Sequence, residues 1–139
     1  MKTFVVLAVS IVLVGIFFCP MAMSAPSMPA DLQIVQPDPS LPKELSAFFG
    51  KWEGRDNYGE YFLIVEKIDE GKASLYWYMR SAGAGGEGWE RTEGNVTKDR
   101  GKYKVWYSSR FGTREIILKG EYLNVFGPGW NINLRRVVP

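Results

Sequence analysis

The sequence predicts an all-β domain that closes into a small eight-stranded antiparallel up-and-down barrel. From Phe49 onward, short segments rich in β-branched and aromatic residues alternate with glycine-containing turns. Every connection between these segments is too short for a crossover, so neighbours in sequence should pair antiparallel. Closing such a sheet into a barrel removes its two open edges. A sandwich, or an open and strongly curled sheet, is the alternative.

Residues 1–24 have the pattern of a secretory signal peptide. Lys2 provides a short positive region, Phe4–Phe18 is an apolar run, and Ala22-Met23-Ser24 supplies small residues for cleavage after Ser24. The apolar run is shorter than the roughly 20 residues that a spanning helix needs. We therefore expect a secreted or periplasmic protein with a cleaved leader. An uncleaved leader that anchors the chain in a membrane is the alternative.

Cys19 is the only cysteine, and the chain contains no histidine. Lipid modification of Cys19 is disfavoured because Phe18 is bulky where a lipoprotein signal has a small residue. Once the leader is removed, the chain has no thiol and no imidazole, which excludes disulfides, Ser-His and Cys-His pairs and ordinary zinc sites. Glu53, Glu66 and Glu115 show no spacing that selects a glycosidase pair. We therefore expect no enzyme, no metal and no cofactor.

Residues 25–42 should form a proline-rich linker ahead of a barrel domain at residues 43–139. The prolines are Pro26, Pro29, Pro37, Pro39 and Pro42. Such a composition, with few large apolar groups, is typical of an extended and solvated tether. Leu41–Phe49 then predicts a single helical turn with Ser40 as its cap, ended by Gly50.

Eight strands are expected, at residues 49–55, 61–68, 73–80, 88–96, 102–108, 112–119, 121–127 and 129–136. Alternation is clearest in the last strand, where Trp130, Ile132 and Leu134 share one face. It is also clear in residues 73–79, where alternate positions are apolar. The run Tyr61–Val65 is apolar on both faces, so its inward set is ambiguous.

The loops of such a meander fall alternately at the two ends of the barrel. One end carries residues 69–72, 97–101 and 119–121, which are short and charged. The other end carries the glycine-rich loops 56–60, 81–88, 109–111 and 127–130, which include aromatic side chains. We expect an open mouth at this second end. The candidate ligand-binding residues there are Tyr58, Trp89, Arg110, Phe111 and Trp130. Alternatively, the glycines only relieve crowding at tight corners and the aromatic side chains fill the core.

Trp52 begins the first strand and therefore belongs to the charged end. The last strand also finishes at this end, which brings Arg135 or Arg136 beside Trp52. A guanidinium over the indole would seal the barrel by packing and cation–π attraction. Alternation along the last strand favours Arg136, whereas a twist at the strand end would favour Arg135.

These residues resemble the calycin superfamily, which includes lipocalins, fatty-acid-binding proteins and avidins. Gly50-Lys51-Trp52 is similar to the Gly-X-Trp motif at the start of the first calycin strand, and Arg135 or Arg136 matches the basic residue that packs across that tryptophan. The resemblance implies a barrel with Gly50, Trp52 and one arginine as its structural anchor. The chain departs from lipocalins in having no C-terminal helix after the last strand and no cysteine pair, and the biotin contacts of avidins are not recognisable.

The resemblance implies that the barrel holds a small hydrophobic or amphipathic molecule, which we take as the expected partner. One alternative is a carbohydrate- or cell-envelope-binding module that uses surface aromatics, and another is a structural protein-interaction domain without a ligand. The chain has 17 basic and 15 acidic residues, which are interspersed without blocks. This pattern gives no footprint for nucleic acid and no basic patch for a membrane surface, so we expect a membrane contact only through an uncleaved leader.

Overall fold

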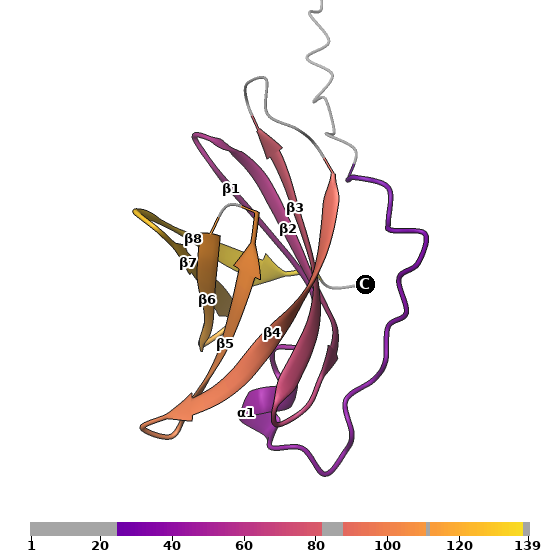
Figure 1. The fold of residues 1–139 in the computed structure, drawn as a ribbon, viewed down its shortest axis with the longest axis vertical. Coiled ribbons are helices and arrows are strands. Elements are labelled where there is room, and N and C mark those ends of the chain that lie inside the picture. Colours follow the sequence, from indigo (N-terminus) through magenta and orange to yellow (C-terminus); the bar gives the residue numbers. More distant parts are fainter. Residues whose placement is uncertain (1–24, 82–87, 111, 138–139) are drawn as a thin grey trace, which may run out of the picture.

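The computed structural model describes residues 25–81, 88–110 and 112–137. They form a closed antiparallel barrel whose strands follow one another in sequence order, with the first strand also paired to the last (Figure 1). The elements are α1 (Lys43–Ser46), β1 (Gly50–Asp56), β2 (Gly59–Ile68), β3 (Lys72–Ser81), β4 (Trp89–Asp99), β5 (Lys102–Ser109), β6 (Gly112–Lys119), β7 (Tyr122–Gly127) and β8 (Trp130–Arg136). The predicted fold class and the eight strands are confirmed, and the sandwich and the open sheet are not formed. No helix in the described part of the chain has the length and apolar character to cross a bilayer.

The single helical turn is shorter than the sequence suggested. It begins at Lys43 with Pro42 at the N-cap position, and no side chain caps it. Ser40 was expected to be the cap, but its backbone N–H and its hydroxyl both donate to the Asp38 carboxylate. This local turn uses the Ser40 side chain, so the chain enters the helix only after Pro42.

The core fills the barrel from the closed end. Leu45 and Phe48, from α1 and the residues after it, are fully buried beneath Trp52. Inward side chains of β3 and β8 alternate as expected, with Leu75 and Leu134 among the most buried. Each large apolar side chain removed from water in this way contributes roughly 1.5–3 kcal/mol. The packed half of the barrel therefore supplies a rigid base for the opposite end.

Residues 25–42 run along the outer wall of the barrel and will be called the N-terminal strap (Figure 1). The N–H groups of Gln33 and Val35 donate to the side chain and the carbonyl of Glu66, and Trp89 donates its indole N–H to the carbonyl of Ser27. The strap is extended, as expected, but it differs from a solvated tether because it is docked on β2 and β4. Outward-facing side chains beneath it, Ile64, Glu66, Tyr76 and Tyr78, are buried.

The β2–β3 hairpin is closed by Asp69. Its carboxylate accepts hydrogen bonds from the N–H groups of Gly71 and Lys72, at 2.9 and 2.8 Å. These two hydrogen bonds hold the pKa of Asp69 below its ordinary value, and the bond from Gly71 has the larger effect. A lowered folded-state pKa means that the ionised side chain stabilises the protein above the unfolded-state pKa, and that this contribution is lost as the pH falls through the folded-state value.

Asp69→Ala should therefore lower the melting temperature at pH 7, with a difference from wild type that shrinks under acid conditions. Thermal unfolding followed by circular dichroism between pH 7 and about pH 2.5 would measure the difference across the range in which carboxylates titrate. A difference that stays constant over this range would contradict the role given to the ionised carboxylate.

Candidate ligand-binding site

A cavity of about 540 Å³ opens at the end of the barrel opposite α1. This is the end at which the sequence predicted a mouth, and β1, β3, β5 and β7 all finish there. Its described lining consists of Asp56, Tyr58, Tyr61, Trp77, Met79, Ser81, Gly88, Glu90, Arg110, Arg114, Gly129 and Trp130. These residues come from six different strands and from the loops, so the cavity is a property of the closed barrel.

Three aromatic side chains build one wall of the cavity. Trp130 of β8 stacks with Tyr61 of β2 at a centroid distance of 6.3 Å and an interplanar angle of 21°. Trp77 of β3 lies 5.8 Å from Tyr61 and 6.4 Å from Trp130. The wall therefore offers a large, rigid apolar surface, which is the usual way in which small-molecule sites gain contact area.

Arg114 of β6 is the charged side chain that faces this wall. It is only 3% exposed, and its guanidinium carbon lies 4.5 Å from the ring centroid of Trp130 and 5.5 Å from that of Trp77. Cation–π attraction therefore holds the guanidinium against the aromatic wall. Its Nε and Nη1 atoms are buried and have no hydrogen-bond partner among the described residues.

The two carboxylates of the lining already have partners. Asp56 accepts hydrogen bonds from the N–H groups of Tyr58 and Gly59, at 2.7 and 3.1 Å, and from the hydroxyl of Tyr61. Burial raises the pKa of Tyr61 to about 12, and the hydrogen bond to Asp56 is the next largest cause of this increase. The hydroxyl therefore stays protonated. Glu90 accepts a bond from the Arg110 N–H at 3.0 Å through one oxygen. Its second oxygen lies 4.0 Å from Arg110 Nε but is buried without a hydrogen-bond partner among the described residues.

Two neutral groups near Arg114 are also without partners. Tyr107 lies directly opposite Arg114 in the β5–β6 pairing, and burial raises the pKa of its hydroxyl. This hydroxyl and the indole N–H of Trp77 are buried and unbonded within the described part of the chain. Both groups donate hydrogen bonds in their neutral forms. Of the two, Trp77 belongs to the cavity lining and Tyr107 does not.

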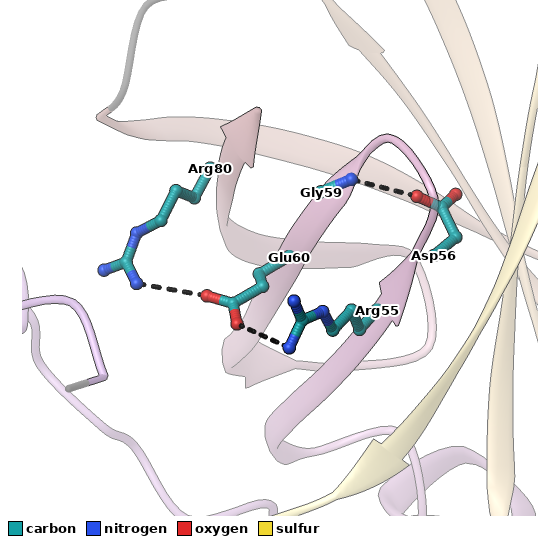
Figure 2. Close-up of polar contacts among 5 residues, drawn as sticks. All are labelled: Arg55, Asp56, Gly59, Glu60 and Arg80. Atoms are coloured by element: carbon teal, nitrogen blue, oxygen red, sulfur yellow. Dashed lines mark hydrogen bonds and ion pairs between the residues drawn. The ribbon is translucent and has the colours of Figure 1, made fainter. Parts of the chain in front are cut away.

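The outer rim beside the mouth is held by a separate set of charges (Figure 2). Glu60 lies between Arg80, at 3.1 Å, and Arg55, at 3.8 Å, while the Asp56 carboxylate faces the turn and accepts from Gly59. Arg55 is largely exposed, so its pair adds little stability. The cluster joins β1, β2 and β3 across their outer faces, and its three members are not part of the cavity lining.

The structure brings together three of the predicted site residues. Tyr58, Arg110 and Trp130 line the cavity. Trp89 does not, because its ring lies on the outer wall beside Tyr76 and Tyr78 and under the strap. Phe111 lies outside the described residues.

The sequence reasoning missed the inner part of the site. Tyr61, Trp77, Glu90 and Arg114 line the cavity but were not proposed as site residues. A signal for Arg114 was present, because strand alternation puts it on the same face as the buried Ile116. A charged residue on the inward face of a strand is unusual enough to mark a candidate site.

At the opposite end an arginine of β8 packs over Trp52. The guanidinium carbon of Arg136 lies 4.3 Å from the ring centroid of Trp52, and its two terminal nitrogens donate to the carbonyls of Phe49 and Ala47. Arg136 is therefore the arginine in contact, while Arg135 pairs with Glu53 along the backbone and is exposed. Gly50 has a φ of +116°, and a Cβ there would stand 2.9 Å from Arg136 Nη1.

Within residues 25–81, 88–110 and 112–137, no group of three or more Asp, Glu, His or Cys side chains is arranged to hold a metal ion. The closed eight-stranded barrel is compatible with a calycin-like fold. Comparisons with protein-family models, curated proteins and solved structures found no match to this chain.

Proposed function

We propose that this protein is a calycin-like binding protein that holds a small hydrophobic or amphipathic molecule in the mouth of its barrel. The observation that carries the proposal is the cavity of about 540 Å³ with its aromatic wall and its buried, unpaired Arg114. Ligand pockets in proteins commonly measure 300–1,000 Å³ and combine apolar walls with a few fixed polar groups. The role is binding rather than catalysis, and the ligand enters at the mouth, the end of the barrel opposite α1 and the buried Trp52.

The alternative of a carbohydrate-binding surface has less support. Such a surface needs aromatic side chains aligned on one solvent face. The exposed aromatics of the described residues are Tyr58, Trp106 and Tyr122, which lie in the β1–β2 turn, on β5 and on β7. The outer wall of β3 does carry Tyr76 and Tyr78, but both are buried under neighbouring groups. The aromatic groups therefore favour the cavity.

Native mass spectrometry of the protein purified gently from its own host tests the proposal. We expect a species heavier than the chain alone, with the extra mass released on denaturation. The denatured chain would at the same time give the position of leader cleavage, which we propose to follow Ser24 before release to the periplasm or medium. A protein that carries no small molecule, and that binds neither 1-octanol nor octanoate in a calorimetric titration, would contradict the binding function.

Tyr58 provides a test of the mouth that leaves the fold intact. It is 73% exposed and lines the cavity, so Tyr58→Ala should weaken ligand binding several-fold through lost contact area with little change in stability. The matched control is Tyr122→Ala, which removes a 52% exposed tyrosine of β7, outside the cavity lining. Calorimetric titration of both variants would measure the effect, and equal weakening by the two would argue against the mouth as the binding site.

A further inference from the structure

We propose that the cavity is selective for a neutral carboxamide head group on an apolar body, and that Glu90 receives the N–H group of this amide. This inference rests on the proposed binding function and names the class of ligand. It goes beyond an apolar cavity because it assigns a hydrogen-bond donor to the ligand and a side chain to that donor.

The inference begins with a donor and an acceptor that are cross-strand neighbours on the inner wall. Glu90 of β4 stands directly opposite Trp77 of β3 in the antiparallel register, and both residues line the cavity. Side chains in such a pair share one face, with Cβ atoms about 4.5–5.5 Å apart. The indole N–H of Trp77 and the Oε2 atom of Glu90 are buried, and neither has a hydrogen-bond partner among the described residues. The wall thus offers an unused donor beside an unused acceptor.

The carboxylate of Glu90 is held in place through its other oxygen. Oε1 accepts the backbone N–H of Arg110 at 3.0 Å, which ties the side chain to the end of β5. Oε2 lies 4.0 Å from Arg110 Nε, which is beyond hydrogen-bond distance. A buried carboxylate oxygen that accepts no hydrogen bond has lost its hydration without compensation. An N–H group of a ligand at this atom would restore the missing bond.

The charges of the lining favour a neutral head group. The described lining has two acidic side chains, Asp56 and Glu90, and two basic ones, Arg110 and Arg114. Their formal charges cancel, so a charged head group would lose its hydration without meeting an excess of opposite charge. A carboxylate beside Trp77 would also face the Glu90 oxygen. An ammonium group there would face the guanidinium of Arg114, whose carbon lies 5.5 Å from the Trp77 ring centroid.

A primary carboxamide matches this pair of side chains. It has a carbonyl oxygen that accepts and an N–H that donates, side by side on one edge. The N–H meets Glu90 Oε2, and the carbonyl accepts from Trp77 Nε1. An ester or a dimethyl amide would leave Glu90 without a donor. The aromatic wall formed by Tyr61, Trp77 and Trp130 then accommodates the apolar body of the ligand.

A different role for Glu90 must be separated by the experiment. If the side chain only holds Arg110 in place, its removal would weaken all ligands alike. The informative quantity is therefore the ratio of affinities for a primary amide and its N,N-dimethyl derivative with the same body. Steric exclusion of the two methyl groups would also produce a preference, but that preference would persist when Glu90 is replaced.

The test uses isothermal titration calorimetry at pH 7 with octanamide, N,N-dimethyloctanamide, octanoate and octylammonium, and with hydrocinnamamide and its N,N-dimethyl derivative as a second series. Wild-type protein should bind each primary amide about 10- to 100-fold more tightly than its dimethyl derivative, the range expected of a hydrogen bond to a charged acceptor. It should bind both charged octyl compounds more weakly than octanamide. Glu90→Met should remove the preference and retain the affinity for the dimethyl amides. Glu90→Gln, which keeps an acceptor oxygen without the charge, should show an intermediate preference.

Glu93→Met is the matched control, because Glu93 lies on the same strand, is exposed and does not line the cavity. It should keep the full preference for primary amides. The proposal is overturned if a folded Glu90→Met keeps the preference, or if wild type binds octanoate or octylammonium more tightly than octanamide. Equal binding of the primary and dimethyl amides by wild type would leave the binding function standing and refute only the selectivity. If Glu90→Met does not fold, an undiminished preference in Glu90→Gln would refute the role of the carboxylate.

Discussion

Replacing Trp52 with alanine should lower the free energy of unfolding by roughly 3–5 kcal/mol, the range for truncating a large buried aromatic side chain. Trp52 is 1% exposed, packs in the core cluster with Leu45 and Phe48, and donates its indole N–H to the Phe48 carbonyl at 2.9 Å. Its ring also packs against the guanidinium of Arg136. Alanine removes all of these contacts at once. A domain of this size has a total stability of about 5–15 kcal/mol, so the variant should be partly or wholly unfolded at 37 °C.

Urea denaturation at 25 °C measures this loss as a shift of the midpoint at constant slope. Trp106→Ala is the control, since this tryptophan of β5 is 40% exposed and outward-facing, and its truncation should cost no more than about 1 kcal/mol. Equal midpoints for Trp52→Ala and wild type would refute the role of Trp52 as the anchor of the closed end.

The second large effect is expected at Gly54, where the barrel closes. Among the described residues the β1–β8 seam has two residue pairs, Trp52 with Arg136 and Glu53 with Arg135. At Gly54 a Cβ would stand 2.7 Å from the carbonyl oxygen of Asn133 and 2.7 Å from a methyl group of Leu134. Gly54→Ala should therefore push β8 away and destabilise the barrel by about 1–3 kcal/mol, as overpacked sites do.

Gly71→Ala separates this steric effect from the general effect of replacing glycine. The atom nearest to a Cβ at Gly71 is Asp69 Oδ1, at 3.8 Å, which is an ordinary contact. This variant should unfold within about 0.5 kcal/mol of wild type, the usual range for surface substitutions. Hydrogen exchange of the β8 amides would add a local measurement, because a loosened seam opens more often. A Gly54→Ala variant as stable as Gly71→Ala would contradict the close packing of the two strands.

The fold was predictable because strand alternation is a local property of the sequence. Trp130, Ile132 and Leu134 share a face whatever surrounds them, and the same parity carries Arg136 to the ring of Trp52. The docking of the N-terminal strap was not predictable from the composition of the strap itself. The relevant signal lay in β2, where Tyr61–Val65 is apolar on both faces. A strand of that kind needs a cover on its outer side as well as a core on its inner side.

The candidate site was only partly predictable, for two physical reasons. Loop residues such as Tyr58 and Arg110 are assigned to an end of the barrel by topology alone, so their position at the mouth followed from the strand order. Side chains at strand ends depend on parity, and a shift of one residue moved Trp89 to the outer wall while Glu90 faced the cavity. Arg114 escaped notice because charged strand residues normally belong to the solvated face.

Detachment of the N-terminal strap would expose a surface through which two copies of the barrel could associate. Ile64, Tyr76 and Tyr78 would reach water together, and a contiguous apolar patch on a sheet surface is adhesive towards other copies. The docked strap keeps this patch from water and from contact with other copies. Its prolines suit that task, since they offer no N–H for a further strand to pair with.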